Sequence, residues 1–204
     1  MKNILTSFLL IVLVFSSCNP IDPNKEIDEG SVKGENYKSK EIGWSIEIPK
    51  GWKIMTRDKI ESSGQKGNEA LEKTIGQPVD TKFLKHLISF QKDPFNIFMS
   101  SSEPFDEEFP GEFQVNNKQL YEILYQTFID QGIKVDTTSG KEQIQNLEFE
   151  TFHTTIYSPK GEIIMNQVLY SRLINGFSFG VTICYNNLAD KTTLIETFKN
   201  SKFE

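Results

Sequence analysis

The chain has 204 residues, of which 37% are hydrophobic and 12% aromatic, and its formal net charge is −6. This length suits one globular domain with a buried core, and sixteen phenylalanines favour a sheet-rich core. Lys and Arg are scattered along an acidic chain without a basic stripe, which argues against nucleic acid or an anionic bilayer as an electrostatic partner.

The first seventeen residues have the form of a secretory leader. A short positive start at residues 1–3 precedes an apolar run at 4–15, which is shorter than the roughly 20 residues of a membrane-spanning helix. The run ends in Phe15-Ser16-Ser17-Cys18 and lacks an Ala-x-Ala cleavage site. This stretch resembles the lipobox of bacterial lipoproteins, although an aliphatic residue is usual at the position of Phe15.

The lipobox resemblance implies removal of residues 1–17 and diacylation of Cys18. We therefore expect a lipid-anchored protein of the cell envelope whose domain lies in the periplasm or at the cell surface. Asn19 stands where inner-membrane retention favours Asp, so the outer membrane is the expected location. A single-pass anchor and a plain secreted protein remain the alternatives.

Cys184 is the other cysteine, so a lipidated chain has no partner for an internal disulfide. It lies in a strand pattern, which favours a small buried side chain. A catalytic thiol would need His86 or His153 as its base, because these are the two histidines of the chain.

Residues 18–37 combine the lipidation site with a stretch rich in Pro, Gly and acidic residues. This composition predicts a flexible tether that adds nothing to a core. The sequence thus predicts a single globular domain at residues 38–204.

The domain opens with short strands. Residues 44–48 alternate between apolar and polar and predict a strand, and Pro49 to Gly51 turn the chain into a second strand at 52–54. Residues 57–70 are polar, and a short helix is expected at 68–75. Two further strands are expected at 86–91 and 96–101.

The clearest predicted helix covers residues 118–131. Asn116 can cap it, Gln119 occupies the capping-box position, and Gly132 can end it in a left-handed conformation. The expected apolar stripe is Leu120, Ile123, Leu124 and Phe128.

Three strands are expected at 147–157, 162–174 and 177–185, and Asn175-Gly176 predicts a tight hairpin between the last two. The last strand has one large-residue face and one small-residue face, formed by Ser178, Gly180, Thr182 and Cys184. This pattern predicts a sheet covered on both sides, with a helix close over the small face. A final helix begins at Asn187 and Asp190 and presents Leu188, Leu194, Ile195 and Phe198.

Together these elements predict an α+β fold with a central antiparallel sheet and helices on both faces. "GWSIEIPKGW" (43–52) is similar to the opening hairpin of PsbP-like domains, and "INGFSFGVTICYNN…LIETFKNSKF" (174–203) is similar to their last hairpin and helix. The resemblance covers about residues 37–204 and implies an α/β/α sandwich with a binding or assembly role and without enzymatic activity. It identifies no functional residue.

Residues 101–113 combine carboxylates and phenylalanines around two prolines and a glycine. Three interpretations are open: a site for a hard cation such as calcium, aromatic anchors with an acidic rim for a partner, or a solvated loop. The residues concerned are Glu103, Phe105, Asp106, Glu107, Glu108, Phe109 and Glu112.

No GxSxG, HExxH, P-loop or GxGxxG motif occurs in the sequence, and two separate histidines predict no zinc site. No cofactor, metal or catalytic residue is expected. The leading hypothesis is a non-catalytic accessory domain that docks on an envelope protein complex. The alternative is a carrier for a lipid, glycan or peptide on the face of Ser178, Gly180 and Thr182, and the third is an enzyme without a recognised motif.

Overall fold

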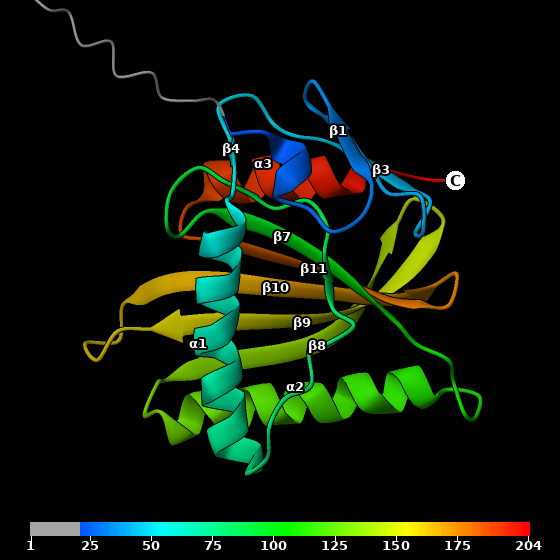
Figure 1. Ribbon diagram of the computed structural model, residues 1–204. Helices are drawn as coiled ribbons and strands as arrows, with labels where there is room; N and C mark the ends of the chain where they lie inside the picture. Colours follow the sequence, from blue (N-terminus) through cyan, green and yellow to red (C-terminus); the bar gives the residue numbers. More distant parts are fainter. Residues whose placement is uncertain (1–20) are drawn as a thin grey trace, which may run out of the picture.

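The computed structural model describes residues 21–204 (Figure 1). The predicted leader at 1–17 and the lipidation site at Cys18 lie outside the described residues. Within residues 21–204, no helix is long and apolar enough to cross a membrane.

A large antiparallel sheet forms the middle layer, in the order β4-β6-β7-β11-β10-β9-β8, with β5 also paired to β7. Its hairpin between β10 and β11 closes on Asn175 and Gly176 with positive φ angles of 51° and 79°, as predicted. The strands are β4 (Lys53–Ile54), β5 (Lys85–His86), β6 (Phe90–Gln91), β7 (Ile97–Pro104), β8 (Val135–Ile144), β9 (Leu147–Tyr157), β10 (Ile163–Ile174) and β11 (Phe177–Tyr185).

A small antiparallel sheet and α3 (Leu188–Lys199) cover one face of the large sheet. The small sheet has the order β1-β2-β3-β12 and consists of β1 (Ser31–Lys33), β2 (Asn36–Lys38), β3 (Trp44–Glu47) and β12 (Lys202–Phe203). The other face carries α1 (Arg57–Ile75), which crosses the strands, and α2 (Glu112–Asp130), which runs along β8 and β9 (Figure 1). The prediction of an α+β fold with helices on both faces is confirmed.

The core lies between the large sheet and the layer of the small sheet and α3. Trp44 is at its centre with no exposed surface, and its ring lies 5.7 Å from Tyr37 and 5.0 Å from Phe179. Phe198 of α3 lies 6.4 Å from the Trp44 ring. The side chains of the last strand that point into this core are the large ones, as the alternation predicted.

The prediction that residues 19–37 add nothing to a core is wrong. A 3₁₀ turn, η1 (Pro23–Lys25), is followed by β1 and β2, and β2 pairs with β3. Tyr37 is fully buried, and Ile27 and Val32 are 9% and 6% exposed. These apolar residues are too widely spaced for a local periodicity, and only pairing with β3 brings them into the core.

Two element boundaries differ from the prediction. The first helix begins at Arg57 and not at residue 68, because Glu26 of the N-terminal segment accepts a hydrogen bond from the Arg57 N–H. The second begins at Glu112, after Gly111 with a φ of 88°, so Asn116 lies inside the helix and does not cap it.

Other predictions about pairing and burial also fail. The strands β3 and β4 belong to different sheets and do not form a hairpin with each other. The strand β8, which the sequence did not indicate, is an edge strand with few buried residues. Leu120 and Leu188 are 37% and 78% exposed, so they do not belong to the apolar stripes assigned to them.

Candidate functional site

The helix α1 carries small residues on its inner side and packs only loosely on the sheet. Only Ile60 of its 19 residues is buried. Gly64 and Gly67 follow at helical spacing and line cavities beneath the helix, and a Cβ added at either one meets no atom within 4 Å. Glycine costs about 1 kcal/mol relative to alanine inside a helix. Two such glycines weaken α1 and leave open space under it.

An apolar groove lies under α1, between this helix, α2 and the sheet. It has a volume of about 320 Å³. Its apolar walls come from all three layers: Ala70 and Leu71 of α1, Leu124 and Phe128 of α2, and Phe152 and Leu169 of the sheet. Thr127, Thr154 and Gln167 add polar groups to the lining. A mostly apolar concavity with a few polar groups is the usual form of a small-molecule site.

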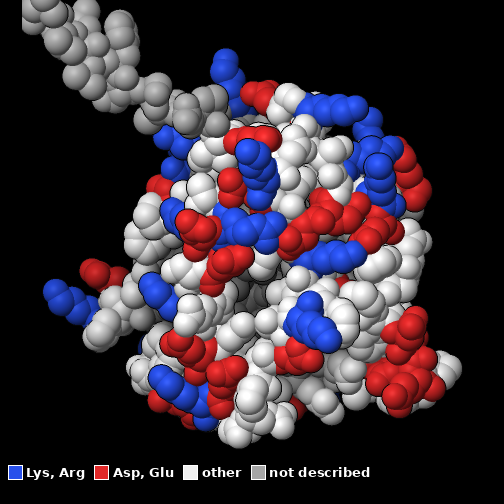
Figure 2. Space-filling view, in the orientation of Figure 1, with Lys and Arg blue, Asp and Glu red and all other residues white. Residues whose placement is uncertain are grey.

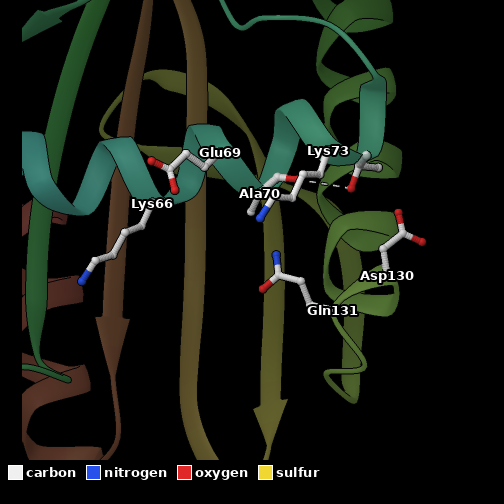
Figure 3. A pocket seen from close by; sticks show the side chains of 7 residues that line it. Lys66, Glu69, Ala70, Lys73, Asp130 and Gln131 are labelled. Carbon is white, nitrogen blue, oxygen red and sulfur yellow. Dashed lines mark hydrogen bonds between the residues drawn. The ribbon is translucent and has the colours of Figure 1, made fainter.

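The mouth of this groove is charged and lies between α1 and the end of α2. Lys66, Glu69 and Lys73 stand on α1, and Asp130 and Gln131 lie across from them, with Gln131 directed toward α1 (Figure 3). This part has a volume of about 300 Å³ and shares Lys66, Ala70 and Gln131 with the groove. The Thr74 hydroxyl donates a hydrogen bond to the Ala70 carbonyl at 3.4 Å.

Neither lysine at the mouth forms a salt bridge with the described part of the protein. Within residues 21–204, no salt bridge includes Lys66 or Lys73. Glu69 and Asp130 instead accept hydrogen bonds from the amides of Gln65 and Gln126, at 3.0 and 2.6 Å. The two ammonium groups are therefore available to an anionic group of a ligand.

Tyr121 attaches α2 to the sheet beside the groove. Its ring stacks on Phe152 with 4.7 Å between centroids and 5° between planes, and its hydroxyl lies 3.0 Å from the Ser171 Oγ. Burial raises the pKa of Tyr121, so its hydroxyl stays protonated in the neutral range. The sequence did not single out Tyr121, because the expected apolar stripe of the helix lay on the neighbouring residues.

The predicted ligand face of Ser178, Gly180 and Thr182 lies on the same side of the sheet as the groove. All three residues are half-buried, and the nearest atom to a Cβ added at Gly180 is the Ser101 Oγ at 3.6 Å. The prediction of a helix close over this face is therefore wrong at Gly180, because the nearest side chain there belongs to β7 and not to a helix. Thr182 lines a separate cavity of about 210 Å³ with Ile60 and Gly64 of α1, whereas Ser178 and Gly180 line neither this cavity nor the groove.

The other side of α1 borders a wide hollow. It has a volume of about 570 Å³ and lies between α1 and the segment that contains Val79, Leu84 and His86. Figure 2 shows the middle of this face hollowed, with acidic and basic side chains around it. Because the hollow is open and polar, it offers less apolar contact than the groove.

The acidic residues of segment 101–113 belong to the strand β7, the loop that follows it and the start of α2. Glu103 is on β7, where burial and the nearby Asp80 raise its pKa. Glu107 and Glu112 accept hydrogen bonds from the N–H groups of Phe113 and Glu108, at 3.1 and 2.6 Å, and so complete the start of α2.

The aromatic residues of this loop differ in exposure. Phe105 packs on Phe113 at 5.8 Å, whereas Phe109 is 50% exposed and Asp106 and Glu108 lie at the surface near it. Within residues 21–204, no three His, Cys, Asp or Glu side chains gather as they do around a metal ion. The arrangement does not favour the cation interpretation, and the exposed Phe109 with its acidic neighbours fits both the partner interpretation and the solvated loop.

Cys184 and the histidines occupy ordinary structural positions. Burial raises the pKa of Cys184 to about 12, so its thiol is protonated at neutral pH and acts as a small packed side chain. The backbone of His86 exchanges two hydrogen bonds with Asp28, and His153 is an exposed residue of β9.

Comparison with known proteins supports the fold. No family model matches the sequence, and no curated protein does. Among solved structures, the chain is similar to cyanobacterial PsbP (CyanoP) from Synechocystis sp. PCC 6803, with a TM-score of 0.55 over 86% of this chain and 98% of that chain. The sequence identity is 8%, so the similarity concerns the fold. The chain has a PsbP-like fold, as its two end segments implied.

Proposed function

We propose that this protein is a lipid-anchored, non-catalytic binding domain of the cell envelope that holds a small amphiphilic ligand between α1 and α2. The observation that carries this proposal is the loose packing of α1 on the sheet. Gly64 and Gly67 leave open space between this helix and the sheet, where the apolar groove lies. Alanine at either position would stabilise the helix more than glycine does. Helix stability alone therefore does not account for the two glycines, whereas the open space does.

The shape and charge of the groove define the class of ligand. A volume of about 320 Å³ suits an acyl chain or a comparably small apolar group. Lys66, which lines both the groove and the mouth, and Lys73, which lines the mouth further along α1, favour a carboxylate or phosphate head group. The ligand is therefore an anionic amphiphile with its apolar part under α1.

We expect Gly67→Leu to weaken the binding of a fluorescent fatty acid, parinaric acid, at least about tenfold. The new side chain projects into the open space of the groove and displaces the acyl chain, while leucine favours the helix more than glycine does. A fluorescence titration of the full mature chain measures the affinity, and thermal unfolding checks that the fold is kept.

Two control variants separate filling of the groove from other effects. Gly67→Ala adds one methyl group and should leave most of the affinity, and Gly64→Leu fills the cavity at Thr182 and not the groove. The groove proposal is wrong if the fatty acid does not bind saturably to the unsubstituted chain. It is also wrong if all three variants bind equally well.

The anchor and the absence of catalysis rest on other observations. The leader and Cys18 support lipidation, and intact-mass spectrometry of the native membrane protein measures the acyl chains directly. The PsbP-like fold and the ordinary environments of Cys184 and His153 support a binding role. An unmodified Cys18 would refute the anchor and leave the groove proposal intact.

The sequence also predicted docking on an envelope protein complex, and one surface favours this as a second function. Phe83 and Phe109 are 62% and 50% exposed, and Phe83 lines a cavity with Pro104, just before the loop that contains Asp106, Glu108 and Phe109. Aromatic side chains with an acidic rim suit a basic segment of a partner protein.

If docking occurs there, Phe83→Ser with Phe109→Ser should abolish a crosslinked complex that forms with the unsubstituted protein in native membranes. The matched variant Tyr125→Ser changes an aromatic residue that is 42% exposed on the outer side of α2 and should keep the complex. Equal crosslinking of all three proteins contradicts docking through this surface.

A further inference from the structure

Five exposed apolar side chains lie at the end of the domain where the chain enters it, and we call this set the apolar tip. Their exposed fractions range from 41% to 78%, although each is large and apolar. The set consists of Ile21 (50%), Phe95 (43%), Ile163 (59%), Ile164 (41%) and Leu188 (78%).

The tip is assembled from segments far apart in the sequence. Asn96 joins the loop of Phe95 to the segment before Leu188, because its amide exchanges hydrogen bonds with Asn186 at 3.0 and 3.2 Å. The Lys92–Asp190 ion pair, at 2.6 Å, ties the same two segments. These contacts present Phe95 and Leu188 on a rigid support.

The hairpin end of β9 and β10 adjoins this support. Asn166 of β10 pairs with Tyr185 of β11, so Ile163 and Ile164 lie beyond the end of β11, where α3 begins. The N-terminal residues enter the domain beside β4, whose Lys53 pairs with Gln91 just before the loop of Phe95 (Figure 1). The loop of Phe95, the start of α3 with Leu188 and the start of β10 with Ile163 and Ile164 therefore lie at one end of the large sheet, and the described chain begins near it, beside β4 (Figure 1).

The folded N-terminal segment places this end close to the proposed anchor. Because η1 begins at Pro23 and β1 and β2 belong to the small sheet, the chain from Cys18 to the first described residue, Ile21, contains only three Cα–Cα steps. Three steps span at most about 11 Å. A lipid on Cys18 therefore holds the domain against the head groups and not at the end of a long tether.

We propose that the apolar tip lies on the bilayer and fixes the orientation of the domain. The occupant is the lipid surface itself, because the short chain from Cys18 leaves this end nearest to the membrane and the apolar side chains suit the interface. This inference rests on the proposed lipidation of Cys18.

The orientation has a consequence for the two candidate sites. The loop at 105–111 that holds Phe109 lies at the far end of the large sheet from the loop of Phe95 (Figure 1). The acidic and aromatic surface then faces away from the membrane, where a soluble or membrane-bound partner can reach it. The apolar tip thus gives the lipid-anchored domain one fixed orientation on the membrane.

The test uses a weak anchor so that the contribution of the protein can be measured. A single acyl chain gives marginal, reversible membrane binding. We would couple one palmityl maleimide to Cys18 of the mature chain and measure co-sedimentation with phosphatidylcholine vesicles. Buried Cys184, with its raised thiol pKa, does not react under native conditions.

We expect Phe95→Ser with Leu188→Ser to lower the vesicle partition coefficient about tenfold. The matched control, Tyr125→Ser with Ile129→Ser, removes two side chains that are each 42% exposed on α2 and should leave partitioning unchanged. Both pairs change exposed residues, and thermal unfolding confirms that each protein is folded.

Three results would overturn the proposal. Equal partitioning of all proteins means that the tip does not touch lipid, and an equal loss in the control pair means that contact is not confined to the tip. Dimerisation of the unacylated chain that is lost only in the Phe95 and Leu188 variant assigns the tip to a second copy. Because the acyl chain is supplied chemically, these results are independent of whether Cys18 is lipidated in the cell.

Discussion

Replacing Trp44 by alanine should lower the free energy of unfolding by about 4 kcal/mol, the cost typical of truncating a large aromatic residue in a core. Trp44 has no exposed surface, and its ring contacts five aromatic rings contributed by both sheets and α3. Truncating Trp44 therefore removes contacts between the two sheets and α3. Guanidinium unfolding followed by circular dichroism measures the loss of stability.

Two other substitutions make the result specific. Trp44→Phe should cost less than half as much, because the buried indole Nε1 has no hydrogen-bond partner within residues 21–204 that the change would remove. Trp52→Ala should also cost less, since this part-buried residue has one aromatic neighbour, Phe90, at 6.0 Å. Similar losses for Trp44→Ala and Trp52→Ala would contradict the central position of Trp44.

Removing the chain through Lys38 should destabilise the domain by at least about 4 kcal/mol, whereas a chain that begins at Asp22 should be nearly as stable as the mature protein. The longer deletion removes fully buried Tyr37, the pairing of β2 with β3, and the Asp28–Arg57 ion pair at 2.7 Å. Chemical unfolding of the two truncated proteins measures the difference.

A point substitution tests the same segment if the longer deletion does not fold. Gly30 has a φ of 84°, and a Cβ there would lie 2.5 Å from the Lys38 carbonyl oxygen. Gly30→Ala should therefore cost about 2 kcal/mol through backbone strain and the clash. Gly34→Ala is the matched control, because that glycine also has a positive φ but no atom within 4 Å of the added Cβ. Equal losses for the two would mean that the segment is not packed against Lys38.

The groove could not be predicted from the sequence, because the distance between α1 and the sheet has no local signal. Small residues at Ser178, Gly180 and Thr182 suggested a helix close to the sheet, yet the helix that crosses this face has glycines of its own at 64 and 67. Neither set of small residues indicates the distance between the two surfaces. That distance depends on the contacts that hold both ends of α1, at Asp28 and on α2, which join residues far apart in the chain.

The sequence by itself determined the elements whose signals are local. Alternation along residues 177–185, the Asn175-Gly176 turn and the Asn187 cap, which accepts from the Asp190 N–H at 2.9 Å, each depend on a few neighbouring residues. The apolar leader and the residues before Cys18 likewise form a local pattern. The tertiary structure alone decided that residues 23–38 are part of the core, that α1 packs loosely on the sheet, and that Phe95 and Leu188 share a surface. The physical reason is that burial, cavities and exposed patches are made by pairing of distant segments, and a local pattern contains no information about which segment becomes its neighbour.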